Sequence, residues 1–579
     1  MRYKLIEGSL NDEHNVEATI LKNRGIKNIN RFLAPGESDT YSYSLLDNID
    51  EAVKCAEKHI QNKDRIHILV DCDVDGYASA SMVYRAFKKI DPNLNITYSL
   101  HTKKQHGLSK DIIIPDDCKL LIIPDAGSND VEQCRELKDK GMDIIVLDHH
   151  ICDVENDYVI VVNNQMCRYP NKNFCGAGIV YKFLEALDEE LWEDTASGML
   201  DMCALANISD VMDMRELETR YYVLRGLTKI RSKLFKALID KQSYSMNGIV
   251  NITSVQFYIT PVLNAMIRIG DQDEKDLLFR AFIETDEVFK YKKRGETEEV
   301  DESIYDRAAR LCSNAKARQT KEVTKEVTEV ERLISDKRLN ENKAIFANVT
   351  GILGKTLTGL VAIKIAEKYN LPTLLLRRQA PRENGELFYG GSCRNFDNSP
   401  IESLKKELLN TELFEFVQGH DNAAGFSIAR DNVQAAISCI NNNWKDIDFQ
   451  AIWQVDFDKN AEDIDVAFVK AIDDMKDMFG QGVKEPLVHI SHIPVYKEST
   501  MIMGKNLNTW KTIFNDELAF VMFSVDRDKD QIIQEYENEE ETFDSLLGYM
   551  DVVGKATLNN YKGILTPQII VKDYEFTKA

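Results

Sequence analysis

Long apolar segments are missing from this sequence of 579 residues. No uninterrupted run approaches the roughly 20 apolar residues that cross a bilayer, and residues 1–7 lack the apolar core of a secretory signal peptide. We therefore expect a cytoplasmic protein without membrane contact. The length favours three or four domains, each large enough to bury a core of its own.

Closely spaced cysteine pairs are also missing. The 11 cysteines are scattered without any Cys-x-x-Cys, and several lie inside apolar segments, as Cys118, Cys203 and Cys439 do. Neither a zinc site nor a disulfide framework is favoured by this pattern. We expect reduced, buried thiols.

Basic residues are fewer than acidic ones. The sequence has 72 lysines and arginines and 95 aspartates and glutamates, which give a formal net charge of −23. This charge argues against a protein that coats nucleic acid nonspecifically, since neutralising phosphates supplies sequence-independent affinity. It does not exclude a nuclease, because divalent ions neutralise clustered carboxylates locally and a narrow basic path is compatible with an acidic exterior. We expect weak, salt-sensitive DNA binding.

Acidic residues cluster directly after the largely apolar segment 66–70. Asp71, Asp73 and Asp75 follow at alternate positions, and Gly76 then allows a turn. In a strand, alternate residues point to the same side, so we expect the carboxylates to converge. Hard oxygen ligands of this kind suit Mg²⁺ or Mn²⁺, so the segment predicts a metal site at a strand's carboxyl end.

Two further apolar segments end in the same way. Asp125 follows residues 121–124, and the triplet from Asp148 to His150 follows residues 144–147. Alternation of strand and helix patterns up to about residue 235 predicts a parallel, doubly wound sheet. Ligands bind such sheets beyond the carboxyl ends of the strands, so the three segments are expected to supply one cluster.

These segments resemble the motifs of the DHH phosphoesterase superfamily. Residues 175–183 and 204–211 are similar to phrases of the RecJ-like single-strand exonucleases, and they occur in that family's order. Residues 390–394 and 419–426 resemble the signature segments of the DHH-associated domain. The resemblance covers most of the chain.

The resemblance implies an α/β fold with two α/β lobes joined by a long helix and followed by an OB-like β-barrel domain. A polar helix is predicted from residue 304 to 334, and the charged run 296–302 before it is expected to be a solvated loop. The expected domains are an N-terminal arm and helix over residues 1–60, a DHH catalytic domain over 61–235, a helical connector over 236–340, a DHH-associated domain over 341–445 and an OB-like domain over 446–579.

The resemblance also implies the metal ligands. The candidates are Asp71, Asp73, Asp75, Asp125, His149 and Asp210. Asp125 is expected to bridge two ions, whereas Asp71 is either a ligand or an orienting group. Asp210 is preferred to Asp213 because it matches the register of the family's motif, although Ala206 and Asn207 stand where the family commonly has glycine and threonine.

Two residues of the triplet are candidates for catalytic roles. His150 follows the ligand His149 directly and is expected to face the scissile phosphate as a hydrogen-bond donor or acid. Asp148 is expected to be a ligand or to orient its neighbours.

Contacts to the substrate follow from the resemblance as well. Ser392 and Arg394 are expected to bind a terminal phosphate, for which arginine forks and hydroxyl donors are suited. Arg268 resembles a further basic residue of the family. His420 lies in a turn of small residues and is a candidate contact, with a purely structural turn as the alternative. His101 stands where the family carries an arginine, so end recognition is expected to be altered.

The C-terminal strands suggest a second nucleic-acid contact. OB barrels bind single strands through a basic groove with stacking aromatic residues. Lys555, Tyr561 and Lys562 are candidates for this groove. Plain solvated positions are the alternative.

The function predicted from the resemblance is that of a RecJ-type exonuclease. It would hydrolyse single-stranded DNA from the 5′ end to 5′-mononucleotides with two Mn²⁺ or Mg²⁺ ions, in recombination or repair. We expect a monomer, and recruitment of a single-strand-binding protein or a helicase stays open. The alternatives are a DHH phosphodiesterase acting on short oligonucleotides or cyclic dinucleotides, and a replication scaffold without catalysis.

Overall fold

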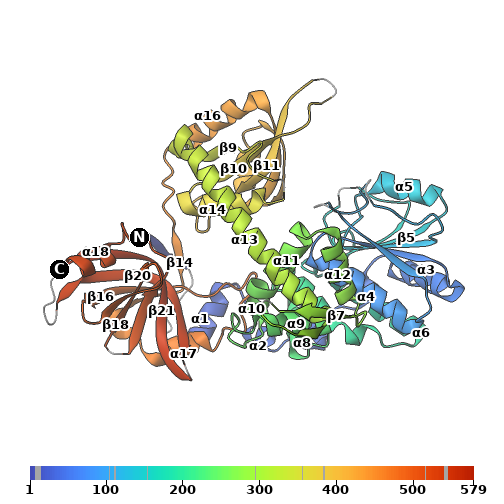
Figure 1. Cartoon of the computed structure of the whole chain (residues 1–579), viewed down its shortest axis with the longest axis horizontal. Helices are drawn as coiled ribbons and strands as arrows, with labels where there is room; N and C mark the ends of the chain where they lie inside the picture. The colour runs from blue at the N-terminus through green and yellow to red at the C-terminus, as the bar shows by residue number, and fades with distance from the viewer. Residues whose placement is uncertain are drawn as a thin grey trace. The chain divides into compact units, whose positions relative to one another are not determined.

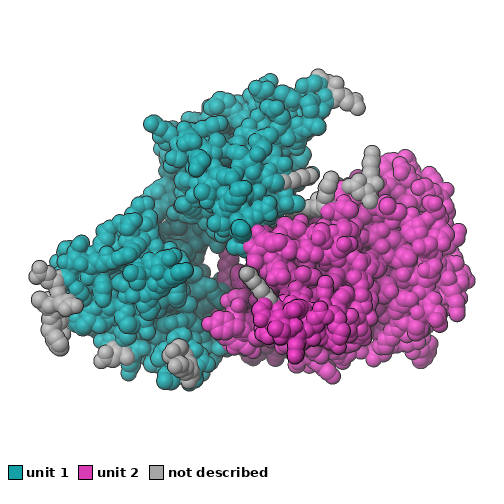
Figure 2. Space-filling view, in the orientation of Figure 1, with its two compact units in different colours: residues 1–25, 320–476, 485–579 teal, residues 26–319, 477–484 magenta. Residues whose placement is uncertain are grey.

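The protein is described from a computed structural model covering residues 1–6, 15–102, 105–109, 112–152, 154–293, 295–354, 356–382, 385–515, 517–539, 545–561 and 563–579. The chain divides into two compact units (Figure 2). Unit 2 contains residues 26–319 and 477–484, and unit 1 contains residues 1–25, 320–476 and 485–579. Within the described residues, no helix has both the length and the apolar character of a membrane span.

Unit 2 is built on a parallel sheet of five strands in the order β3-β2-β4-β5-β6. The strands are β2 (Ile66–Val70), β3 (Ile96–Leu100), β4 (Leu120–Pro124), β5 (Asp143–Asp148) and β6 (Ile160–Asn163). All residues of β2 and β4 are buried, which explains why both strands are apolar apart from His67, whose ring nitrogens hydrogen-bond to Thr97 and Ser99. The strand order reverses between β2 and β4, the position at which doubly wound sheets form their ligand crevice.

Helices pack around this sheet and extend the unit beyond it (Figure 1). The helices and helical turns are η1 (Glu37–Asp39), η2 (Tyr43–Leu45), α2 (Ile29–Leu33), α3 (Ile49–Asn62), α4 (Val74–Ile90), α5 (Val131–Asp139), α6 (Gly176–Leu191), η3 (Ala196–Gly198), α7 (Leu200–Ser209), α8 (Leu217–Thr228), α9 (Lys233–Gln242), α10 (Ile252–Ser254), the π-helical turn η4 (Val255–Ile259), α11 (Thr260–Ile269) and α12 (Gln272–Phe282). The predicted parallel, doubly wound arrangement is confirmed.

Arg220 of α8 fastens two distant segments of the chain to unit 2. Its buried guanidinium donates to the backbone oxygen of Phe32 at 2.8 Å and to that of Met478 at 3.2 Å, and it lies 3.7 Å from the centre of the Phe32 ring. Burial lowers the pKa of Arg220 to about 10. The bond to Met478 is one reason why residues 477–484 belong to unit 2 although their neighbours in sequence belong to unit 1.

The charged run 296–302 differs from its prediction as a solvated loop. Its second half enters strand β8 (Glu299–Ser303), which pairs with β7 (Val288–Lys292) in an antiparallel hairpin. Glu302 is buried and accepts from Arg310 Nε at 2.7 Å and Nη2 at 2.8 Å. The predicted long helix follows as α13 (Ile304–Lys337), which continues from unit 2 into unit 1.

Unit 1 begins its α/β lobe with a mixed sheet in the order β12-β13-β11-β10-β9. The elements are β9 (Ile345–Asn348), α14 (Thr358–Tyr369), β10 (Thr373–Arg378), β11 (Phe388–Arg394), α15 (Leu404–Leu409), β12 (Phe414–His420), β13 (Ala423–Ala429), η6 (Arg430–Asn432) and α16 (Val433–Asn443), with η5 (Leu339–Glu341) before them. Leu374, Phe426, Ile428 and Trp444 belong to its buried core. The predicted second lobe is confirmed.

The C-terminal part of unit 1 is a sheet of seven strands in the order β15-β16-β20-β21-β19-β18-β17. Its elements are β15 (Phe457–Asn460), η7 (Ala461–Asp463), α17 (Val466–Asp473), β16 (Val488–Tyr496), β17 (Thr500–Met503), β18 (Thr509–Phe514), β19 (Leu518–Met522), α18 (Gln531–Asn538), β20 (Leu546–Tyr561) and β21 (Ile564–Lys578). Near the N-terminus, β1 (Tyr3–Leu5) pairs with β14 (Trp453–Val455), and α1 (Val16–Asn23) follows. The predicted β-rich C-terminal domain is confirmed.

Candidate metal centre

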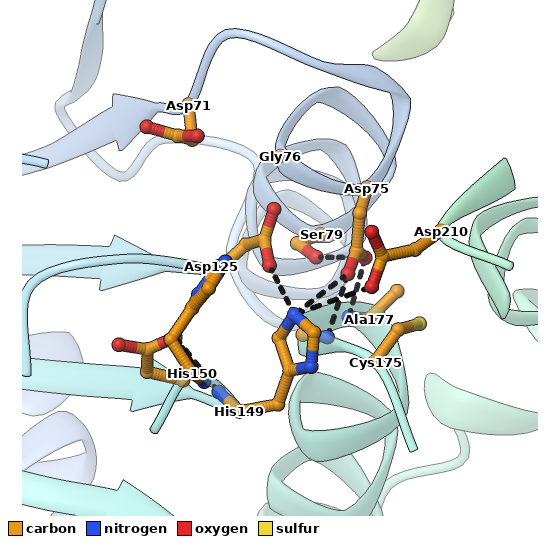
Figure 3. Close-up of polar contacts among 12 residues, drawn as sticks. Asp71, Asp75, Gly76, Ser79, Asp125, His149, His150, Cys175, Ala177 and Asp210 are labelled. Carbon is orange, nitrogen blue, oxygen red and sulfur yellow. Dashed lines mark hydrogen bonds and ion pairs between the residues drawn. The ribbon is translucent and has the colours of Figure 1, made fainter. Parts of the chain in front are cut away.

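The predicted ligands of unit 2 meet beyond the carboxyl ends of the sheet (Figure 3). Asp71 follows β2, Asp125 follows β4, and His149 follows β5. Asp210 follows α7. The ligand atoms of Asp75, His149 and Asp210 lie within 4.8 Å of one another, as do those of Asp71, Asp73 and Asp125.

The reason given for this convergence in the sequence was wrong. Strand β2 ends at Val70, so Asp73 and Asp75 do not alternate along a strand. Asp73 instead caps α4 by accepting from the Gly76 backbone N–H at 3.0 Å, and Asp75 lies in the first turn of that helix. The carboxylates gather because the chain turns sharply from strand to helix.

Two glycines allow this turn and the close approach of the next segment. A Cβ atom on Gly76 would lie 2.6 Å from Cβ of Asp71, and one on Gly176 would lie 2.5 Å from Oδ1 of Asp125. Such distances are shorter than any ordinary van der Waals contact. Side chains at these positions would therefore push Asp71 and Asp125 out of place.

His149 stands at the middle of the cluster. Its Nε2 lies 3.2 Å from Asp125 Oδ1, 3.4 Å from Asp210 Oδ2 and 3.8 Å from Asp75 Oδ2. Both Nε2 of His149 and Oδ1 of Asp125 are buried, and neither has a hydrogen-bond partner among the described residues. Burial lowers the pKa of His149, which favours the neutral imidazole that binds metals.

Asp75 is fixed by the first turn of α6. It accepts from the backbone N–H groups of Gly176 at 2.7 Å and Ala177 at 2.8 Å, and from Ser79 Oγ at 3.1 Å. Orphan N–H groups at a helix start favour a negative partner. These hydrogen bonds orient the carboxylate toward the cluster.

The other carboxylates repel one another. Burial, and then the charge of Asp75, raises the pKa of Asp125 and of Asp210 well above the usual range. Within the described residues, no lysine or arginine lies at ion-pair distance from these three carboxylates, and the basic group that faces all of them is the imidazole of His149. An excess of buried negative charge, one imidazole and spare oxygen ligands are the donor set that suits Mn²⁺ or Mg²⁺, so the residues fit such an ion.

Backbone strain is found at two points of the same centre. Asp125 has φ of 65° and Val211, directly after Asp210, has φ of 59°. The left-handed region costs non-glycine residues roughly 1–2 kcal/mol, and more bulk at Cβ makes it rarer. Strain of this kind collects at functional sites, where the surrounding structure maintains it.

Asp148 holds the two histidines rather than facing the cluster. It accepts from the backbone N–H groups of Ser128, His149 and His150, and from His150 Nδ1 at 2.8 Å. Burial raises the pKa of Asp148, but the hydrogen bond and charge of His150 outweigh burial and the net shift is downward. Burial likewise lowers the pKa of His150, but Asp148 outweighs it and raises that pKa to about 9. The half-exposed His150 ring therefore carries a proton at neutral pH.

Asp71 is enclosed by two histidines, one of which the sequence did not single out. His106 Nδ1 lies 2.6 Å from Asp71 Oδ2, and the Gly107 N–H donates to Asp71 Oδ1 at 3.0 Å. The bond to Asp71 raises the pKa of His106 to about 11. The sequence signal was available, since a histidine directly precedes the glycine of the segment that carries His101.

His101 was predicted to contact the substrate, and the structure places its side chain beside Asp71. Its ring is almost fully buried and lies against Asp71, with Nε2 at 3.6 Å from Oδ1. His106 is the half-exposed member of the pair. A direct substrate contact of His101 stays a prediction, and its observed position is that of a group supporting Asp71.

The candidate contacts of unit 1 lie on adjacent strands. Ser392 and Arg394 belong to β11, and both Arg394 and His420 are in register with Ala423 of β13. The start of α14 adjoins them, because a Cβ atom on Gly359 would lie 2.6 Å from Arg394 Nη2 and 3.8 Å from Ser392 Oγ. A guanidinium, a hydroxyl and a helix N-terminus together suit an anion.

The remaining candidates are placed differently. Arg268 lies on α11 of unit 2 and is half-buried. Lys555 pairs with Glu485, so its charge is already matched. Lys562 and the side chain of Tyr561 lie outside the described residues.

Comparison with known proteins agrees with this arrangement. The DHH family N-terminal domain matches residues 65–207, and the RecJ OB domain matches residues 455–573. A relative in Bacillus subtilis (strain 168), described provisionally as the SPbeta prophage-derived single-strand DNA-specific exonuclease YorK, is 40% identical over 100% of this chain and 99% of its own. The single-stranded-DNA-specific exonuclease RecJ of the same bacterium is 25% identical over 96% of this chain and 67% of its own.

Solved structures agree on the fold. The crystal structure of RecJ in complex with Mn²⁺ from Thermus thermophilus aligns with a TM-score of 0.68 at 18% identity, covering 100% of this chain and 79% of that one. Given the full-length relative at 40% identity and the two matching domains, the chain belongs to the RecJ-like family of single-strand DNA-specific exonucleases, hydrolases of the DHH superfamily.

Proposed function

We propose that this protein is a divalent-metal-dependent exonuclease that hydrolyses single-stranded DNA from the 5′ end to 5′-mononucleotides, in DNA recombination or repair. The observation that supports this best is the buried Nε2 of His149, which faces the carboxylates of Asp75, Asp125 and Asp210 and has no hydrogen-bond partner among the described residues. The names of the relatives in Bacillus subtilis support the substrate class.

Asp73, Asp75, Asp125, His149 and Asp210 would hold two ions. Structures of Thermus thermophilus RecJ in complex with Mn²⁺ and with Mg²⁺ support the choice of ion. When bound, such ions polarise a phosphoryl oxygen and make a coordinated water nucleophilic near neutral pH. The count of two stays part of the proposal.

The residues around the ions have separable tasks. Asp148 keeps His150 protonated and oriented, so that His150 donates a hydrogen bond to the phosphate or a proton to the leaving oxygen. His106 and His101 hold Asp71 in place beside the first turn of α4. Asp71 then acts as a ligand or as an orienting carboxylate.

Recognition of the chain end is assigned to unit 1. Ser392, Arg394 and the start of α14 would bind a terminal phosphate, with His420 as an additional contact. Arg268 would contact an internal phosphate from unit 2. Since His101 replaces the family's arginine and lies against Asp71, end binding would depend more strongly on Arg394.

The test is digestion of internally labelled single-stranded DNA with Mn²⁺ and with either the 5′ or the 3′ end blocked. Resistance only when the 5′ end is blocked is the expected result. Protection by a 3′ block alone would overturn the polarity and keep the metal centre. Competition by short RNA distinguishes the oligonucleotide phosphodiesterase, and absence of cleavage in every arm would favour the scaffold.

A further inference from the structure

Two adjacent aromatic side chains of unit 2 are exposed without an evident structural task. Phe257 and Tyr258 lie on the π-helical turn η4, between α10 and α11, and are 64% and 40% exposed. Aromatic side chains contribute most to folding when buried, so a neighbouring exposed pair is informative. π-helical turns themselves occur frequently at functional sites.

A side-chain hydrogen bond ties this turn to the metal centre. Thr260, the first residue of α11, has its Oγ1 at 2.9 Å from Ser209 Oγ, and Asp210 follows Ser209 directly. Thr260 follows Phe257 by three residues, which corresponds to about 5 Å along a helix axis. Val211, on the other side of Asp210, is also exposed. The exposed apolar residues therefore flank the side of the centre that Asp210 forms.

The adjoining face of α11 is polar and not fully matched. Thr260, Asn264 and Arg268 recur every four residues, so they share one face of the helix. Oδ1 of Asn264 is buried and has no hydrogen-bond partner within the part of the chain that the structure describes. The Thr260 hydroxyl is bonded to Ser209 and Asn264 Oδ1 is buried, so the half-buried Arg268 is the group of this face that carries charge near the aromatic pair.

We propose that Phe257 and Tyr258 form a platform on which bases of the single strand stack next to the phosphodiester at the metal centre. The proposal rests on the proposed function and assigns the feature that selects its substrate. Every base has a π-face, so stacking tolerates any sequence. In a duplex those faces are covered by neighbouring base pairs, and the platform would therefore favour single strands over duplexes.

The test combines protein variants with substrate variants. Binding and hydrolysis are measured for an oligonucleotide with all bases and for one of equal length with abasic sites at the nucleotides next to the scissile bond. Phe257→Ala should weaken binding of the first strand by roughly 10- to 100-fold, the range for losing one stacked base, and leave the abasic strand unchanged. Tyr258→Ala should act in the same direction.

A matched control is Trp192→Ala. Trp192 is 94% exposed and follows the last residue of α6, a helix of 16 residues that begins at Gly176 beside the centre. About 24 Å separate the two ends of the helix, so this variant should change the binding of neither oligonucleotide. Phe257→Trp should retain binding and Phe257→Leu should lose most of it, because leucine is apolar but has no π-face.

Three outcomes would overturn the platform. These are unchanged binding in Phe257→Ala, an equal loss on both strands, and full retention in Phe257→Leu. Binding is measured with EDTA as well as with Mn²⁺, so the platform is tested even if no strand is cleaved. Absence of cleavage by the wild type would count against the proposed function, whereas the difference between the two strands concerns the platform alone.

Discussion

A buried histidine lies among carboxylates at each end of strand β5, His149 directly after the strand and His59 of α3 beside its first residue, but with opposite consequences. At the carboxyl end, His149 Nε2 faces Asp75, Asp125 and Asp210 without a hydrogen bond. At the amino end, the ring nitrogens of His59 hydrogen-bond to Asp64 at 2.8 Å and Asp143 at 3.0 Å. Burial and an acidic neighbourhood therefore do not distinguish the two sites.

Cations supplied by the protein do distinguish them. Lys58 and Lys138 each lie 2.9 Å from a carboxylate oxygen of Asp143. Burial raises the pKa of Asp143, but these lysines and His59 outweigh burial and the net shift is downward. The pKa of Asp125 moves upward, because burial and other carboxylates act in the same direction. A cluster of histidine and carboxylates is therefore suited to bind a metal ion where no lysine or arginine of the chain neutralises the carboxylates.

The largest expected difference is in the rate of hydrolysis after a carboxylate is removed at one end or at the other. Asp75→Asn should reduce hydrolysis by at least about 1000-fold, because metal ions contribute several kcal/mol to such reactions. Asp143→Asn should stay within about twofold of the wild type, since roughly 17 Å of strand separate it from the centre. Initial rates on single-stranded DNA with Mn²⁺ give both values. Similar losses in the two variants would remove the distinction between the ends.

Replacing each histidine should separate function from stability. His59→Gln breaks hydrogen bonds to charged partners and should cost about 1.5–3 kcal/mol of unfolding free energy without loss of activity. His149→Gln should abolish activity and cost less stability in EDTA, because Nε2 has no partner there. Urea unfolding in EDTA, compared with rates in Mn²⁺, measures both effects. A greater stability loss for His149→Gln would contradict the comparison.

The two ends should also respond differently to pH. The folded state raises the pKa of Asp125 and Asp210, so the metal-free protein binds more protons than the unfolded chain. These residues should therefore lower its stability as pH rises above about 4, the unfolded value. Mn²⁺ should reverse this loss, release protons on binding and bind more tightly with rising pH. Asp143, with a lowered pKa, should contribute stability above about pH 4 and lose it as pH falls further.

Unfolding curves in EDTA at several pH values, followed by Mn²⁺ titrations at the same pH, check these signs. Asp125→Asn should remove the pH dependence of the metal-free protein in part. Metal affinity that is independent of pH would contradict the raised pKa values of Asp125 and Asp210 in the metal-free protein.

The smallest expected effect concerns the neutralising lysines. Lys138→Gln removes one half-exposed partner of Asp143, and such pairs are worth less than about 1 kcal/mol. Unfolding should change by that amount and hydrolysis should not change. Lys58→Gln serves as the matched variant, since Lys58 bonds the other oxygen of the same carboxylate. Lost activity in either variant would connect the amino end of β5 to catalysis.

Much of the fold could be predicted because burial leaves a plain record in the sequence. Strands β2, β4 and β5 are covered by helices on both faces, so they read as mainly apolar runs that lead into acidic residues. The long helix α13 was visible from Val323, Val330 and Ile334, which are buried at helical spacing. Asp71, Asp125 and His149 could be named because each follows one of these strands, whereas Asp210, which follows α7, was named from the resemblance.

The rest depended on contacts that the sequence does not record. Asp73 reads like a strand residue, but its bond to the Gly76 N–H makes it a helix cap. Strand β8 reads like a solvated loop, because Glu302 is buried only with the help of Arg310, eight residues later. His106 could not be ranked above His101 without the bond to Asp71. In each case the structure differs from the prediction because of a hydrogen-bond partner that the local sequence pattern does not reveal.

The central claim is that the carboxylates and His149 of unit 2 form the divalent metal centre, and calorimetric titration with Mn²⁺ at constant pH tests it most directly. The account predicts saturable binding to the wild type and to Asp143→Asn, with at least about tenfold weaker binding to Asp75→Asn and to His149→Gln. Equal binding by all four proteins would contradict it, because the ion would then lie elsewhere in the chain.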